Sequence, residues 1–202
     1  MEPNEIEIKH QFFQEDFFFP NWEIDLLVLG TFNPSCGEKT DYYYGRCRNN
    51  FWRTIESINK LDYMSLQNNF SRKSNLMRTL KFGCVDVIKS ICFIPEKFKK
   101  EICGSGYSDQ LLFSKSKVKL NYQFDEIKDF IDKKKVSKVI NTWGKRDAPK
   151  FFRNEIIRLI NYCNENGIEY IKECPSPSGR LRGEQNLNNL ERFYKKHIGE
   201  IK

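Results

Sequence analysis

The feature that most constrains the fold is a short apolar run that breaks at a glycine. Residues 26–29 are Leu-Leu-Val-Leu, and Gly30 follows them. Consecutive apolar residues of this kind indicate a strand buried on both faces, as in a parallel sheet. The polar loop after Gly30 carries Asn33 next to Pro34. In an open α/β sheet, ligands bind in the loops beyond the carboxyl ends of the strands, so the run also predicts where a site lies.

A second polar loop of the same character occurs late in the chain. Residues 168–174 form another strand-like run, and prolines and serines follow in residues 174–179. Each proline fixes its own φ angle, so this loop is stiff. Because the carboxyl ends of parallel strands lie at one edge of a sheet, we expect the two loops to form a single site.

The rest of the chain alternates between strand-like and helical patterns. Asn49 or Asn50 can cap a helix that begins near residue 51. Further helices are expected at residues 74–82, 124–135, 147–167 and 187–198, and strands at residues 24–29, 84–88, 136–142 and 168–174. This alternation implies a parallel sheet covered on both faces. We predict an α/β fold, a three-layer α/β/α sandwich with a short central parallel sheet of about four strands.

The chain divides into an arm and one domain. Residues 1–23 are aromatic and irregular, which indicates an arm that covers the edge of the sheet. Residues 24–202 form the domain, since a chain of 202 residues suits one domain. Residues 96–121 are rich in lysine and contain two glycines, which indicates an exposed excursion from that domain.

Composition suggests a compartment and a partner. No run approaches the ~18 to 20 apolar residues of a membrane span. The N-terminus carries Glu2, Glu5 and Glu7 and lacks the basic start of a signal peptide. We therefore expect a soluble, cytoplasmic protein, a monomer with no membrane partner. The net charge of +7 favours a polyanion such as nucleic acid, or reflects only a solvated lysine-rich surface.

The cysteines do not indicate a metal site or a disulfide framework. Seven cysteines stand at positions 36, 47, 84, 92, 103, 163 and 174, and none forms a C-x-x-C pair. The only histidines are His10 and His197. We expect most of the cysteines to be reduced and buried as small apolar residues, and no metal. An iron–sulfur cluster would need about four cysteines brought together by the fold, which local spacing does not support.

Three short motifs follow one another along the chain. Residues 30–34 are Gly-Thr-Phe-Asn-Pro, residues 43–52 begin with Tyr-Tyr-Gly and end with Asn-Asn-Phe-Trp, and residues 174–178 are Cys-Pro-Ser-Pro-Ser. Together these motifs resemble those of the uracil-DNA glycosylase superfamily. The first is similar to G-x-N-P-G of the mismatch-specific branch, and the second to Y-Y-G…N-x-F-W of the deoxyinosine-glycosylase-like branch. The third is similar to H-P-S-P of the uracil-specific branch and N-P-S-G of the mismatch branch. The resemblance covers residues 25–195.

The resemblance implies a monofunctional DNA glycosylase that needs no cofactor. Such an enzyme flips a deaminated or mismatched base, for example uracil or hypoxanthine, out of duplex DNA and hydrolyses its N-glycosidic bond to leave an abasic site. It implies that Asn33 places the attacking water and that Ser176 supports the departing base. An amide is a poor general base, so slow turnover is expected. Contacts with the flipped base are implied for Phe32, Tyr44, Asp86 and Cys174; the alternatives are an ordinary core tyrosine for Tyr44 and a surface or helix-capping aspartate for Asp86.

Loops at the same edge are expected to hold the DNA backbone. Leu181 lies between two arginines, which suits a wedge that fills the gap in the base stack, or else it packs on the domain. The expected DNA contacts are Ser35, Arg46, Arg48, Lys145, Pro175, Ser178, Arg180, Leu181 and Arg182.

Two departures from the family pattern leave other interpretations open. Asn33 stands one position later after Gly30 than in the mismatch branch, so it either places water or only forms a turn with Pro34. Asp41 and Asn49 are the alternative polar groups. Cys174 stands where the uracil-specific branch has histidine. A DNA-binding member of the fold without catalysis is therefore an alternative, as is a nucleotide-processing α/β enzyme, although the chain lacks a glycine-rich phosphate loop.

Overall fold

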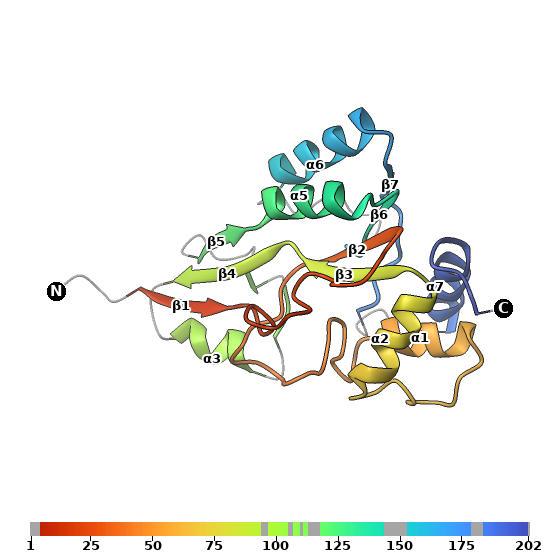
Figure 1. Cartoon of the computed structure of the whole chain (residues 1–202). Helices are drawn as coiled ribbons and strands as arrows, with labels where there is room; N and C mark the ends of the chain where they lie inside the picture. The colour runs from red at the N-terminus through yellow and green to blue at the C-terminus, as the bar shows by residue number, and fades with distance from the viewer. Residues whose placement is uncertain are drawn as a thin grey trace.

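A four-stranded parallel sheet forms the centre of the protein, with the strand order β3-β2-β6-β7 (Figure 1). The strands are β2 (Leu26–Gly30), β3 (Phe82–Asp86), β6 (Lys138–Asn141) and β7 (Glu169–Ile171). All residues of β2 are buried, and β2 pairs in parallel with β3 on one side and β6 on the other. The predicted parallel sheet, built around residues 26–29, is therefore confirmed.

The coordinates are a computed structural model of the whole chain. They describe residues 5–93, 97–104, 107–109, 111–112, 118–143, 153–178 and 184–201. Among these residues, no helix combines the length and the apolar character needed to cross a membrane.

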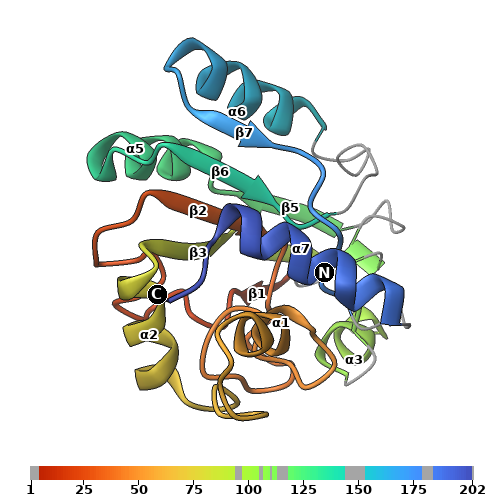
Figure 2. The same cartoon turned by 90° about the vertical axis from the view of Figure 1, so that its right-hand side faces the viewer.

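Helices cover both faces of the sheet and complete the three-layer sandwich (Figure 2). On one side, α5 and α6 pack together, and α6 contacts β7. On the other side lie α1 and α7, which contact each other, together with α2, which contacts β3. The bounds are α1 (Phe51–Ile58), α2 (Phe70–Thr79), α5 (Phe124–Lys134), α6 (Arg153–Glu165) and α7 (Glu184–His197).

Local signals explain several helix ends. Of the two asparagines expected to cap α1, Asn50 holds the N-cap position without a side-chain cap bond, and the Asn49 side chain accepts the Phe51 N–H. Lys135 ends α5 in the left-handed conformation with φ of 54°. The expected helix at 74–82 begins earlier, because the Asn69 side chain caps α2 by accepting the Arg72 N–H at 3.1 Å. Gly83 does not end that helix but lies inside β3, where a Cβ would stand 2.3 Å from Cγ of Pro20.

A second sheet was not expected from the sequence. It is antiparallel with the order β1-β4-β5, and its strands are β1 (Ile6–Lys9), β4 (Ile88–Phe93) and β5 (Val118–Tyr122). Val87 alone separates β3 from β4, so the single strand expected at 84–88 is in fact the junction of two sheets (Figure 1). The N-terminal arm supplies β1 and thus joins a sheet.

The segment expected to be an exposed excursion, residues 96–121, also contributes to the packing. It contains α3 (Lys97–Cys103) and β5, and it buries Ile102, Tyr107 and Leu112. The strand expected at 168–174 is shorter in the structure, since β7 ends at Ile171. The helix start expected near residues 147–149 lies outside the described residues.

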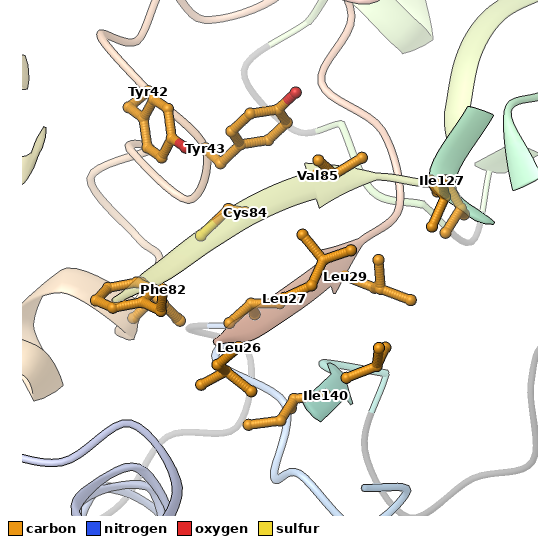
Figure 3. Packing of buried hydrophobic residues seen from close by; sticks show 14 of the residues in the cluster. Leu26, Leu27, Leu29, Tyr42, Tyr43, Phe82, Cys84, Val85, Ile127 and Ile140 are labelled. Atoms are coloured by element: carbon orange, nitrogen blue, oxygen red, sulfur yellow. The ribbon is translucent and has the colours of Figure 1, made fainter. Parts of the chain in front are cut away.

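An aromatic cluster joins the arm to the parallel sheet. Phe12 and Trp22 are buried against Tyr42, and the Trp22 indole donates to the Phe82 carbonyl at 2.9 Å. Figure 3 shows Tyr42 and Tyr43 over one face of β3, close to Cys84. This packing fixes the backbone just before Tyr44.

One cysteine pair corrects the sequence analysis. Cys36 and Cys103 form a disulfide with their Cα atoms 4.9 Å apart, although they lie 67 positions apart in the sequence. Local spacing gives no sign of such a pair. Cys84, Cys163 and Cys174 are free and buried, as expected, while Cys47 is exposed. Within the described part of the chain, no cluster of histidine, cysteine or acidic side chains is arranged to hold a metal ion.

Candidate functional site

Three parallel strands end side by side and set out the candidate site. Gly30 at the end of β2 is in register with Asp86 at the end of β3. On the other side, Thr142 follows β6 and donates through both its N–H and its hydroxyl to the Leu29 carbonyl, at 3.1 and 3.0 Å. The polar side chains of these strand ends therefore face one small region, as expected for the carboxyl edge of a parallel sheet.

Gly30 is needed because two polar groups meet directly above it. A Cβ at this position would lie 2.1 Å from Asp86 Oδ1 and 2.9 Å from Tyr44 Oη. Real Cβ atoms do not approach other atoms so closely, so any side chain here would displace the carboxylate. The glycine thus lets a carboxylate and a phenol converge at the end of the central strand.

Tyr44 is held in place by backbone, ring and hydroxyl contacts. Its φ of 58° is left-handed, which is uncommon for a residue other than glycine. Its ring stacks on Phe51 with the centroids 4.5 Å apart, and its hydroxyl lies 3.1 Å from Thr142 Oγ1. Because Thr142 Oγ1 already donates to a carbonyl, Tyr44 is the donor of this pair. Burial raises the pKa of Tyr44 well above its ordinary value, so the phenol is neutral.

Asp86 is bound by a histidine that the sequence analysis did not assign to the site. His10 Nε2 lies 2.9 Å from Asp86 Oδ2, and both side chains are buried. His10 belongs to the N-terminal arm and lies 76 positions away in the sequence. It stands outside every motif, so no local signal could have indicated this pair.

Asn33 is buried, and both ends of its amide have protein partners. Its Nδ2 donates to Gln11 Oε1 at 2.9 Å and to Thr40 Oγ1 at 3.2 Å. Its Oδ1 accepts from Arg46 Nη2 at 2.7 Å and from Arg46 Nε at 3.2 Å. The oxygen expected to hold a water molecule is therefore bound by an arginine in this conformation.

Arg46 is itself held by the segment that follows α3. Its guanidinium lies 4.8 Å from the centroid of the Tyr107 ring. Burial raises the pKa of the nearby Asp109 carboxyl, while a hydrogen bond from Thr31 and the positive charge of Arg46 act in the opposite direction. Thr31 also accepts from the Trp143 indole at 3.0 Å. These contacts extend the polar network beyond the residues that the motifs indicated.

The described part of the second loop is bonded to the second motif. The Asn50 N–H donates to the Pro177 carbonyl at 2.8 Å, and Asn49 and Ser178 form an isolated β-bridge. Ser176 is partly buried, and its hydroxyl accepts the Ser178 N–H at 3.3 Å. The loop is thus anchored beside the segment that carries Tyr44.

Cys174 is packed beneath this loop, between it and α7. It is fully buried, its sulfur lies 3.8 Å from the Tyr194 hydroxyl, and burial raises the pKa of the thiol to about 12. It is consequently a neutral thiol and supplies no charge to a leaving group. Pro175, next to it, is partly buried.

The other expected site residues have varied environments. Phe32 is buried, and its ring lies at 70° to that of His10 with 5.8 Å between the centroids, while Arg48 is exposed. The Ser35 N–H donates to the Lys9 carbonyl at 3.0 Å, which ties the motif loop to the arm. Lys145, Arg180, Leu181 and Arg182 lie outside the described residues.

The two alternative polar groups have structural partners. Asp41 forms an ion pair with the buried Lys73 at 2.5 Å. The Asn49 side chain accepts the Phe51 N–H at 2.9 Å and so supports the start of α1.

Two pockets defined by described residues lie away from this edge. One of about 500 Å³ lies between α1 and α7, and one of about 370 Å³ lies between the arm and α2. At the edge itself, the described part of the chain after β6 stops at Trp143, and that of the second loop stops at Ser178.

No protein-family model matches this chain, and no curated protein matches it. The functional assignment therefore depends on the order of the motifs and on the geometry of this edge.

Proposed function

We propose that the protein is a monofunctional DNA glycosylase that removes a deaminated or mismatched base, such as uracil or hypoxanthine, from duplex DNA. The observation that carries this proposal is the meeting of Tyr44 and Asp86 above Gly30, at the carboxyl end of the central parallel strand. A flipped base needs an aromatic wall and polar groups for its edge. Phe51 covers one face of Tyr44, and a base would stack on the other.

The proposed reaction is a hydrolysis. The oxygen of a water molecule bonds to C1′ of the sugar while the bond from C1′ to the base nitrogen breaks. The electron pair of that bond leaves with the base, and the proton that the water loses passes to the base or to solvent. Asn33 Oδ1 would accept a hydrogen bond from the water and so place it.

Arg46 has to move for this water to bind. Its guanidinium now donates twice to Asn33 Oδ1. A DNA phosphate binds a guanidinium more strongly than a neutral amide does, so the DNA backbone would draw Arg46 away. In this proposal DNA binding frees the catalytic amide.

Support for the departing base comes from the second loop. Ser176 and the backbone N–H groups of the loop are the candidate donors, because Cys174 is a buried neutral thiol. With an amide to place water and no histidine in either loop, we expect slow turnover. No lysine occupies a motif position, so we expect an abasic site without strand cleavage through a Schiff base.

The proposed DNA surface combines the loops at this edge. Ser35, Arg46, Arg48, Pro175 and Ser178 are its described members. Phosphate contacts from Lys145, Arg180 and Arg182 and a wedge role for Leu181 are also proposed. We further propose that the protein acts as a monomer in the cytoplasm.

One observation favours a second candidate, a DNA-binding member of the same fold without catalysis. The contacts of 2.7 and 3.2 Å from Arg46 fill the position in which Asn33 would hold water. If Arg46 kept this position on DNA, the fold would grip DNA and leave the glycosidic bond intact.

Excision under single-turnover conditions separates the two candidates. Duplexes carrying uracil, hypoxanthine, thymine or xanthine are incubated with excess protein and then treated with alkali, which cleaves the strand at an abasic site. We expect scission by the wild type and by Asn166→Ala, which alters an exposed asparagine at the end of α6, but not by Asn33→Ala. Binding without scission on every substrate supports the second candidate. DNA affinity that does not fall with salt contradicts both.

A further inference from the structure

His10 is a buried polar residue in an aromatic environment. Its imidazole has no exposed surface and is surrounded by aromatic rings with centroids 5.3 to 5.8 Å away, those of Phe12, Phe18, Phe32 and Tyr43. A polar ring buried among aromatic side chains is costly unless its nitrogens are bonded. Both are bonded, one to Asp86 and the other to the backbone of the arm.

The backbone bond decides which nitrogen carries the proton. The Phe12 N–H donates to His10 Nδ1 at 3.1 Å, so Nδ1 has to present its lone pair. A neutral imidazole then carries its proton on Nε2, which donates to Asp86 Oδ2 at 2.9 Å. The histidine thus donates a hydrogen bond to Asp86 Oδ2, and the backbone bond at Nδ1 fixes the orientation of the donating ring.

This bond leaves one carboxylate oxygen for a ligand. With Oδ2 taken by His10, Oδ1 lies above Gly30 beside the Tyr44 hydroxyl. The carboxylate also acts on its surroundings: after burial, the negative charge of Asp86 is a further cause of the raised pKa values of Tyr43 and Tyr44. The phenols therefore stay neutral beside the Asp86 carboxylate.

We propose that His10 is a positioning residue that holds Asp86 as a fixed hydrogen-bond acceptor, so that the site selects a base with a ring N–H on its pairing edge. This inference rests on the proposed glycosylase function and specifies its substrate class. Deamination turns the ring nitrogen N3 of cytosine or N1 of adenine from an acceptor into an N–H donor, as in uracil and hypoxanthine. A fixed carboxylate accepts a hydrogen bond from the ring N–H of the deaminated base. The ring nitrogen of the parent base is itself an acceptor, so it cannot bond the carboxylate.

Paired substrates test this selection directly. Uracil is compared with 3-methyluracil, and hypoxanthine with 1-methylhypoxanthine, in otherwise identical duplexes, so that the two members of a pair differ only in a methyl group that replaces the ring N–H hydrogen. We expect the wild type to prefer the N–H base by roughly a hundredfold or more in kcat/KM, as for loss of a hydrogen bond to a buried charged group. The variants are His10→Phe, which keeps an aromatic ring without a donor, and His10→Gln, which keeps an N–H near the position of Nε2.

The variants distinguish positioning from packing. His10→Phe should lower the preference about tenfold or more, and His10→Gln should restore most of it. Phe12→Leu is the matched packing control, because it changes a ring next to His10 but keeps the backbone N–H, and it should leave the preference unchanged. The melting temperature of each variant shows whether it is folded.

Each outcome has a defined meaning. An unchanged preference in folded His10→Phe, or an equal loss on both members of a pair, overturns the inference and leaves the proposed function intact. If His10→Phe does not fold, Asp86→Asn replaces it, because an amide can present N–H to the base and should reduce the preference equally. If the wild type neither excises any base nor binds a non-hydrolysable 2′-fluoro lesion more tightly than normal DNA, the proposed function and the inference both fail.

Discussion

The substitution Gly30→Ala tests the geometry on which the site depends. The new Cβ would stand 2.1 Å from Asp86 Oδ1 and 2.9 Å from Tyr44 Oη. The carboxylate oxygen must retreat by roughly 1 Å or more to reach an ordinary contact distance. Such a shift breaks the 2.9 Å hydrogen bond to His10, because that bond fixes the same carboxyl group.

The expected cost combines two effects. Loss of a buried hydrogen bond to a charged group costs about 1.5 to 3 kcal/mol, and an extra carbon in a packed site costs about 1 to 3 kcal/mol. We therefore expect Gly30→Ala to lower the free energy of unfolding by about 2.5 to 6 kcal/mol, measured by urea denaturation. Under conditions where the variant is still folded, its single-turnover excision rate should fall at least about a hundredfold, since the Asp86 carboxylate that is proposed to bond the base is displaced.

Two controls make this prediction specific. Gly167→Ala adds a methyl group at φ of 68° with nothing within 4 Å, so it costs only backbone strain, about 1 to 2 kcal/mol, and leaves excision unchanged. In a double-mutant cycle, Gly30→Ala should cost at least about 1 kcal/mol less when Asp86 is already alanine. A Gly30→Ala protein with the stability and excision rate of the wild type would refute the proposed convergence of side chains.

Three further predictions concern charge and burial. Replacing Arg46 with methionine should make the slope of the logarithm of the DNA-binding constant against the logarithm of the salt concentration less steep by about 0.9, as fluorescence anisotropy can measure. An unchanged slope argues against a phosphate contact. Iodoacetamide near pH 8 should label the exposed Cys47 and spare Cys174, whose pKa burial raises to about 12, as mass spectrometry can show; rapid labelling of Cys174 in the folded protein would contradict its burial. Near neutral pH, Lys73→Met should lower the free energy of unfolding by about 3 kcal/mol, because it leaves Asp41 without its ion-pair partner. Burial lowers the pKa of Lys73 below 10.5, so the folded protein binds fewer protons than the unfolded chain, and wild-type stability should rise relative to that of Lys73→Met as the pH approaches 10.5. Urea denaturation near neutral pH and near pH 10 measures this difference, and an equal pH dependence of both proteins contradicts it.

The parallel sheet was predictable because its signals are local. A continuous apolar run such as residues 26–29 can be buried on both faces only in the middle of a layered fold. The start of α1 is likewise encoded within a few positions, because the Asn49 side chain accepts the Phe51 N–H. These signals were sufficient to predict the three-layer sandwich.

The antiparallel sheet was not predictable because its pairing is distant. Ile6 pairs with Phe93, and β4 follows β3 after a single residue. No periodicity within a window can show that one strand stops and another begins at Val87. The disulfide between Cys36 and Cys103 has the same origin, since only the fold brings these residues together.

The candidate site divides in the same way. The resemblance implied base contacts for Tyr44 and Asp86, and the structure brings both side chains to Gly30. The environment of each group depends on other segments: His10 comes from the arm, and Arg46 reaches Asn33 across the site. A buried polar partner of this kind leaves no pattern in the sequence around either residue.

Release of a free base from duplex DNA tests the central claim most directly. Excess protein is incubated with duplexes carrying uracil or hypoxanthine, and mass spectrometry quantifies both the free base and the abasic strand. The account predicts equal amounts of the two products from the wild type and a loss of both with Asn33→Ala. Intact strands after prolonged incubation of the folded, DNA-bound wild type with every lesion would contradict it.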